Sequence, residues 1–227
     1  TQANPVIFTT FRDDEHGASI DLSDTDPAPG DWGSIQIDSA NGATVKIQHA
    51  KVYYAGGDQG SGNQAGGAIF INNSDAEIEI SDVGVYYSQS GIYSRPVAGT
   101  EPNILNSIFE YNRLWGISVQ KDSAIRLIGN SFKCNGLTGN SGTTGGLNIE
   151  GNSTNILIKN NNFLGNQNTG LNYYTQTIGL PKPDSLEAKD NYWGASSGPY
   201  HVSKNLTGAG DTAQGNLNLT PWSQAKY

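Results

Sequence analysis

Five glycines, each opening a short alternation of apolar and polar residues, recur along the chain at spacings of 24, 25, 30 and 24 residues. Alternation with a period of two is typical of a half-buried strand. Repeats of this length are too short to bury an apolar face alone, so they form a core only by stacking on their neighbours. The glycines are Gly67, Gly91, Gly116, Gly146 and Gly170, and Gly33 opens a sixth alternation of the same kind.

A second apolar segment follows each glycine-led strand. When these segments are aligned on their last apolar residue, they give a column of large side chains, and asparagine recurs three residues beyond it. The apolar column is Val52, Val85, Phe109, Phe132, Phe163 and Trp193, and the asparagine column is Asn112, Asn135 and Asn166. We expect both columns to be structural, with rings stacked inside and amides hydrogen-bonded from turn to turn. The sequence therefore predicts an all-β fold, a right-handed parallel β-helix (a solenoid) of about six to seven coils.

The composition suits such a solenoid. Only 35% of the residues are hydrophobic and 29 are glycine, because only the inward half of each strand needs to be apolar and the corners need Gly, Asn or Asp.

We expect one domain over 1–227, with an opening coil and acidic loop (1–33), regular coils (34–190) and a closing segment (191–227). Cys134 lies two residues after Phe132, and we expect it to point inward as a buried apolar side chain.

Charge and hydropathy exclude two classes of partner. The net charge is -8, with 13 Lys and Arg against 21 Asp and Glu. A protein that neutralises nucleic-acid phosphates needs a basic face, so we expect no nucleic-acid partner. No stretch approaches the roughly 20 apolar residues of a membrane span, so we expect no membrane insertion.

Two segments at the ends of the chain resemble a known group. Asn191-Tyr-Trp-Gly-Ala-Ser-Ser-Gly-Pro199 with Gly215-Asn-Leu-Asn-Leu-Thr-Pro-Trp222 looks like a closing segment, and Pro5-Val-Ile-Phe-Thr-Thr-Phe-Arg-Asp-Asp14 with Pro27-Ala-Pro-Gly-Asp-Trp-Gly33 looks like an opening coil. Together with the repeats, they resemble the right-handed parallel β-helix repeat proteins of the pectate-lyase-like fold. More narrowly, the chain is similar to β-helix domains of bacterial and archaeal surface or secreted proteins, which implies an extracellular or cell-surface location. That scaffold carries lyases, hydrolases, adhesins and spacers, so it does not specify an activity.

Enzymes of this group act on polysaccharides along one outer sheet. Projecting the glycine-led strands with Ile and Val inward gives two outward columns: Gln36, Phe70, Tyr93, Ser118, Asn148 and Asn172, then Asp38, Asn72, Arg95, Gln120, Glu150 and Tyr174. Aromatic rings mixed with hydrogen-bonding groups suit a sugar chain. The ligand-binding candidates are Phe70, Tyr93, Arg95, Gln120, Glu150 and Tyr174.

The same columns offer no catalytic set, and we assign no catalytic residue. Asp38 and Glu150 fall four coils apart, roughly 19 Å, whereas a glycosidase needs two carboxyl groups about 5 to 10 Å apart. Arg95 is the one basic residue of the columns, and each acid lies two coils from it, roughly 10 Å. This favours a non-catalytic domain for adhesion, assembly or carbohydrate binding, whose partner is a glycan or a neighbouring surface-protein subunit. A polysaccharide lyase or glycoside hydrolase, and a structural subunit of a surface filament or layer, remain as alternatives.

The opening loop holds a third of the chain's 21 acidic residues, between residues 13 and 31, with no Lys or Arg in that stretch. Carboxylates at close spacing are the oxygen ligands that Ca²⁺ prefers. We expect one structural Ca²⁺ held by some of Asp13, Asp14, Asp21, Asp24 and Asp26; the alternative is a solvated acidic loop with Asx-turns. Four insertions, Gly56 to Gly66, Val97 to Glu101, Gly136 to Gly145 and Gln176 to Asp184, are expected to leave the ends of the glycine-led strands and flank the outward face.

Overall fold

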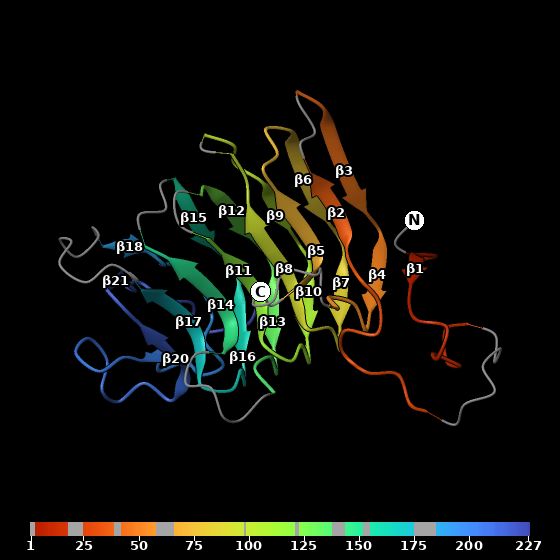
Figure 1. The fold of residues 1–227 in the computed structure, drawn as a ribbon. Helices are drawn as coiled ribbons and strands as arrows, with labels where there is room; N and C mark the ends of the chain where they lie inside the picture. The colour runs from red at the N-terminus through yellow and green to blue at the C-terminus, as the bar shows by residue number, and fades with distance from the viewer. Residues whose placement is uncertain are drawn as a thin grey trace.

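The computed structural model describes residues 3–17, 25–38, 42–57, 66–97, 99–120, 123–137, 144–151, 155–174 and 185–227. Within these ranges the secondary structure is strands and turns without α-helices, and no helix could cross a membrane. The strand pairs are parallel and build three long sheets that face a common core (Figure 1).

Each sheet collects the equivalent strand of successive coils. Sheet A runs in the order β1 (Val6–Phe8), β4 (Ala50–Tyr53), β7 (Gly84–Tyr86), β10 (Ile108–Glu110), β13 (Ser131–Lys133) and β16 (Asn162–Leu164). Sheet B runs β2 (Ile35–Asp38), β5 (Gly67–Asn72), β8 (Ser90–Arg95), β11 (Trp115–Val119), β14 (Gly145–Glu150), β17 (Thr169–Tyr174), β20 (Gly210–Gln214) and β19 (Pro199–Tyr200). Sheet C runs β3 (Thr44–Gln48), β6 (Glu77–Ser81), β9 (Asn103–Leu105), β12 (Ile125–Ile128) and β15 (Ile156–Lys159), and β18 (Leu186–Glu187) pairs with β21 (Leu217–Asn218).

The chain visits the sheets in the order B, C, A, and then repeats. For example, β5 in sheet B is followed by β6 in sheet C and β7 in sheet A, and each of the three pairs with its equivalent in the next coil. This is the connectivity of a parallel β-helix, so the predicted architecture is confirmed.

A single residue turns the chain between sheet C and sheet A. The sequence pattern predicts one continuous segment here, but the structure divides it into two short strands. The corner residues adopt left-handed backbone conformations with φ of 49° to 71°: His49, Asp82, Asn106, Gly129, Asn160 and Asp190. Gly, Asn, Asp and His tolerate this region better than most residues, so the residue type at this position determines where the coil bends.

A second left-handed corner follows sheet A, and it corrects the prediction for Cys134. This residue has a φ of 52° and is half-buried at the corner, instead of pointing into the core. The equivalent corner residues are Tyr54, Tyr87, Tyr111, Gly165 and Gly194. Inward and outward positions alternate only while the strand continues, and the three-residue strand β13 ends at Lys133.

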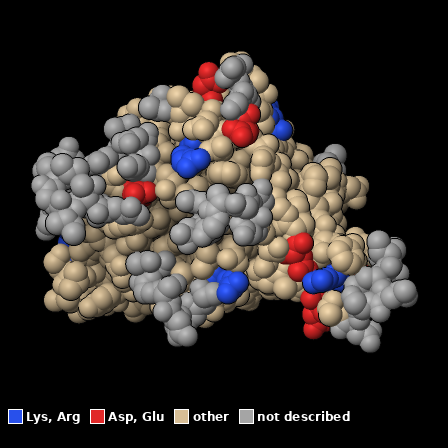
Figure 2. All heavy atoms as spheres, viewed as in Figure 1, with Lys and Arg blue, Asp and Glu red and all other residues tan. Residues whose placement is uncertain are grey.

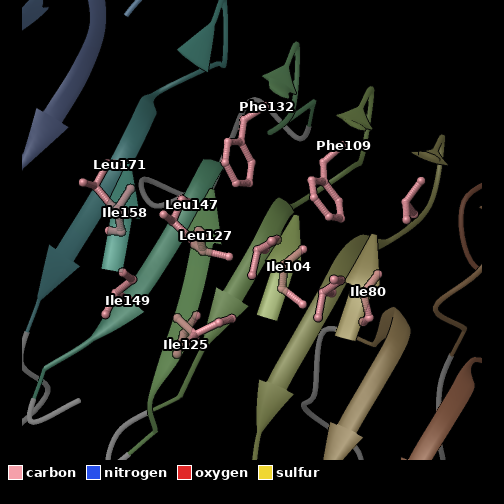
Figure 3. Close-up of a cluster of buried hydrophobic side chains, with 14 of the residues drawn as sticks. Ile80, Ile104, Phe109, Ile125, Leu127, Phe132, Leu147, Ile149, Ile158 and Leu171 are labelled. Carbon is pink, nitrogen blue, oxygen red and sulfur yellow. The ribbon is translucent and has the colours of Figure 1, made fainter. Parts of the chain in front are cut away.

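The apolar column predicted from the repeats forms one wall of the core. Val52, Val85, Phe109, Phe132 and Phe163 pair in register along sheet A, and Trp193 stacks on Phe163 with ring centroids 4.4 Å apart. All six are 0% exposed. Figure 3 shows Phe109 and Phe132 beside Ile and Leu side chains of sheets B and C, all pointing into the same interior.

The predicted asparagine column forms a hydrogen-bonded ladder inside the corner after sheet A. Asn112 Nδ2 donates to Asn135 Oδ1 at 2.9 Å, and Asn135 Nδ2 donates to Asn166 Oδ1 at 2.9 Å. Asp211 ends the ladder by accepting from Asn166 Nδ2 at 2.7 Å. Burial raises the pKa of Asp211, although the hydrogen bonds from Asn166 and Gly165 oppose that rise.

A second ladder, at the corner between sheets C and A, was not predicted. Asn130 Nδ2 donates to Asn161 Oδ1 at 3.1 Å, and Asn161 Nδ2 donates to Asn191 Oδ1 at 3.0 Å. Ser107 begins this ladder, because its backbone N–H donates to Asn130 Oδ1 at 3.0 Å. Asn191 therefore continues an internal ladder as well as opening the closing segment.

The order of strands changes the expected position of two insertions. Residues 56–66 lie between β4 and β5, and residues 136–145 connect β13 to the start of β14, so both precede a glycine-led strand. The insertions at 97–101 and 176–184 follow such strands, as predicted. The four insertions therefore connect to both ends of the strands of sheet B, while residues 58–65, 98, 138–143 and 175–184 lie outside the described ranges.

Candidate functional site

The outer face of sheet B has the two columns predicted from the sequence. In the first column, Gln36, Phe70, Tyr93, Ser118, Asn148 and Asn172 are successive register partners. In the second, Asp38 pairs with Asn72, Asn72 with Arg95, and Glu150 with Tyr174. Gln120 follows β11 directly, and its backbone N–H bonds to Ser94 O at 2.9 Å, which places it beside Arg95.

The aromatic part of the first column is a packed pair. The rings of Phe70 and Tyr93 meet edge to face with centroids 5.5 Å apart. Tyr93 is only 7% exposed, and burial raises the pKa of its hydroxyl, with Arg95 opposing and Glu150 adding to the rise. Phe70 remains half-buried, so it offers more ring surface to a ligand than Tyr93 does.

The polar part of the first column is a third ladder. Asn172 Nδ2 donates to Asn148 Oδ1 at 2.9 Å, and Asn148 Nδ2 donates to Ser118 Oγ at 3.3 Å. These three side chains point outward, yet each is 4% to 5% exposed. Their amides therefore hold neighbouring coils together and offer little surface to a ligand.

The second column is more accessible. Arg95 is exposed, and its Nε and Nη2 donate to Asn72 Oδ1 at 3.1 and 2.6 Å. Asn72 Nδ2 in turn donates to Asp38 Oδ1 at 3.3 Å, so neighbouring coils orient the guanidinium. Gln120 and Tyr174 are half-buried, whereas Glu150 is 4% exposed.

The distance between the two carboxylates of these columns bears on whether they could form the acid pair of a glycosidase. Asp38 on β2 and Glu150 on β14 are separated by β5, β8 and β11. At about 4.8 Å per strand they lie roughly 19 Å apart, farther than the carboxyl pair of a glycosidase. The arrangement of the described residues therefore offers aromatic surface and hydrogen-bond donors, which are binding groups.

The predicted calcium ligands fall in different environments. Asp13 is 2% exposed, and its carboxylate accepts hydrogen bonds from Thr9 Oγ1, from His16 Nδ1 at 2.9 Å and from the backbone N–H groups of Glu15 and His16. Asp14 and Asp26 are exposed. Asp21 and Asp24 lie outside the described residues, and among the described ones no group of three or more His, Cys, Asp or Glu is placed to hold a metal.

Sequence reasoning missed a stack of aromatic rings on the outer side of sheet A. Tyr53 stacks on Tyr86 at 5.0 Å between centroids, and Tyr87 stacks on Tyr54 at 5.9 Å and on Tyr111 at 5.3 Å. Burial raises the pKa of Tyr53 to about 12, with nearby Tyr86 and the acids of the opening loop adding to the rise. The available signal was Val-Tyr-Tyr, which occurs at 52–54 and again at 85–87.

The tyrosines at the corner are conformationally unusual. Tyr54, Tyr87 and Tyr111 have φ of 47° to 57°, which costs roughly 1 to 2 kcal/mol for a residue with a side chain. Ring stacking, at about 0.5 to 1.5 kcal/mol for each pair, offsets part of this cost. Lys133 ends the stack, with its ammonium 5.6 Å from the centroid of Tyr111 and an ion pair to Glu110.

The charged side chains visible on the face shown in Figure 2 are scattered, without a continuous basic surface.

Comparison with known proteins places the fold within a family. No curated protein and no solved structure gives a significant match to this chain. A family model described as a right-handed beta helix region matches residues 66–191, which is more than half of the 227 residues. The chain therefore belongs to the right-handed β-helix family.

Proposed function

We propose that this β-helix domain is a non-catalytic carbohydrate-binding module of an extracellular or cell-surface protein, acting in adhesion or assembly, with a glycan lying along the outer face of sheet B. The observation that carries the proposal is the accessible row formed by Phe70, Arg95, Gln120 and Tyr174, which mixes aromatic rings with hydrogen-bonding groups. Because each strand contributes one side chain per column at a spacing of about 4.8 Å, the row can follow an extended polymer.

Arg95 is the strongest anchor in this row. Its bonds to Asn72 fix the guanidinium, so binding a ligand there costs less side-chain entropy. A guanidinium has five N–H donors, and those that do not face Asn72 remain for a ligand. A planar fork of donors matches a carboxylate, which favours a glycan with uronic acid units.

Binding measurements on variants test the proposal. Arg95→Ala and Tyr174→Ala should each weaken binding to the best ligand of an acidic and neutral polysaccharide panel by about tenfold. Lys46→Ala is the matched control, because it removes an exposed cation from sheet C that makes one ion pair, at 3.8 Å to Glu79. Equal affinity for all four proteins in calorimetry would refute the placement of the glycan on sheet B.

The same panel tests the non-catalytic part of the proposal. Each polysaccharide is incubated with the protein while the absorbance of unsaturated products and the reducing ends are followed. No increase above a protein-free control is expected. Sustained release of either product would instead favour a polysaccharide lyase or a glycoside hydrolase.

A further inference from the structure

A small pocket lies at the corner between sheets A and C, away from the face of sheet B. Its volume is about 160 Å³, and we call it the corner pocket. Strands β4, β7 and β10, which lie side by side (Figure 1), supply its base. Its lining includes Lys51, Asp82, Gly84, Tyr86, Asn106 and Ile108.

The pocket exists because a glycine interrupts an outward column of sheet A. Gly84 lies between Lys51 and Ile108 in register. The ring of Tyr86 folds over it so closely that a Cβ at position 84 would lie 2.4 to 2.6 Å from ring atoms of Tyr86. Stacking on Tyr53, which itself stacks on His16 at 4.2 Å, holds that ring in place as a wall of the pocket.

Several polar side-chain atoms around the pocket make no hydrogen bond to the described residues. His49 Nδ1 is buried without a hydrogen-bond partner, and it lies 4.0 Å from Asp82 Oδ2. Among the described residues, neither Lys51 Nζ nor the Tyr86 hydroxyl has an ion pair or hydrogen bond. The equivalent corner acid of a later coil, Asp190, is instead paired with Lys159 at 3.5 Å.

We propose that the corner pocket binds one neutral sugar ring, such as the terminal unit of a glycan. A hydroxyl group both donates and accepts, so a polyol can donate to Asp82 and accept from Lys51 and Asn106. A ligand with a net charge is disfavoured, because an anion meets Asp82 and a cation meets Lys51. Ile108, which is 41% exposed, supplies apolar surface for the C–H groups of the ring, and the volume suits a single ring better than a polymer. This site is separate from the glycan face proposed on sheet B.

Amide NMR titration with methyl glycosides of glucose, galactose and mannose tests this inference. At least one glycoside should shift the amides of residues 82–86 and Lys51 saturably, with a dissociation constant in the range of about 1 mM that is typical of so small a ligand. Asp82→Asn should weaken this binding about tenfold, because it removes a charged acceptor. Gly84→Ala should abolish it by displacing the ring of Tyr86 into the pocket.

Two variants serve as controls. Asp190→Asn makes the same change at an equivalent left-handed corner, and Arg95→Ala alters only the face of sheet B; both should bind the glycoside like the unmodified protein. If Gly84→Ala fails to fold, the difference in glycoside affinity between Asp82→Asn and Asp190→Asn still tests the inference. The inference is overturned if no glycoside shifts these amides saturably, if the two Asp variants lose affinity equally, or if acetate or ethylammonium binds this pocket more tightly than every glycoside.

Discussion

The ring of Phe132 stacks on the ring of Phe163 with centroids 5.1 Å apart and planes 9° from parallel. Phe109 continues this stack on one side, at 5.5 Å from Phe132, and Trp193 continues it on the other. Four coils thus share one continuous aromatic contact, which links the stability of each coil to that of its neighbours.

Phe132→Ala should lower the free energy of unfolding by about 3 to 5 kcal/mol, because it removes two ring contacts and leaves a cavity that neighbouring coils cannot fill. Urea unfolding followed by circular dichroism measures the change. Leu137→Ala is the control, since Leu137 is 44% exposed and its truncation should change stability by less than about 0.5 kcal/mol. Similar midpoints for the two variants would contradict a structural role for the aromatic column.

Asn135→Ala should also destabilise the protein. The substitution removes the acceptor of the buried backbone N–H of Asn112, at roughly 1 to 3 kcal/mol for an unsatisfied buried group, and it also removes a donor to the carbonyl of Phe109. Asn135→Asp retains the acceptor for Asn112 but places a buried carboxylate against the oxygens of Phe109 and Asn166, so a loss at least as large as that of Asn135→Ala is expected. Asn103→Ala is the control, because the Asn103 side chain makes one long bond, 3.5 Å to Glu101 O; a loss as large as that of Asn135→Ala would refute the ladder's contribution.

Asp13 should make the stability depend on pH in the acid range. Burial raises the pKa of its carboxyl, but the hydrogen bonds from Thr9 and His16 outweigh burial and hold the pKa below its usual value of 3.8. A lowered pKa in the folded state means that Asp13 contributes stability above its unfolded pKa, and that this contribution is lost as the pH falls through the lowered value. Thermal unfolding at several pH values from about 2 to 6 should therefore show a shallower acid loss for Asp13→Asn. Asp14→Asn, the exposed neighbour, should follow the unmodified protein, and parallel curves for all three would rule out this role.

A structural Ca²⁺ in the opening loop remains a proposal. Since the Asp13 carboxylate already accepts four hydrogen bonds, the exposed carboxylates of Asp14 and Asp26 are the more accessible ligands among the described members of the predicted set. A ligand that binds only the folded state raises the melting temperature, so millimolar Ca²⁺ should raise it relative to chelator, while Mg²⁺ should not. Coincident melting curves at micromolar and millimolar Ca²⁺ would refute the site, as would an equal rise for Asp26→Asn.

The sequence predicted the repeating parts of this protein. Every coil buries an aliphatic or aromatic side chain at the same position, so the inward column from Val52 to Trp193 and the outward columns of sheet B followed from alignment of the repeats alone. The same regularity allowed the ladder from Asn112 to Asn166 to be predicted. These features can be predicted from the sequence because equivalent residues of neighbouring coils pair in register, so the same type of residue recurs once per coil.

Features that depend on where the backbone bends were decided by the tertiary structure. A left-handed residue at each corner interrupts the alternation that the sequence pattern assumes, and Cys134 is itself such a residue, with a φ of 52° directly after β13. Contacts between coils likewise decide three other features. They are the burial of the outward residues Tyr93 and Glu150, the stack of tyrosines on sheet A and the corner pocket. The residues that meet in those contacts are separated along the chain by whole coils, so a period in the sequence fixes which coils are neighbours but not how the side chains at their corners pack.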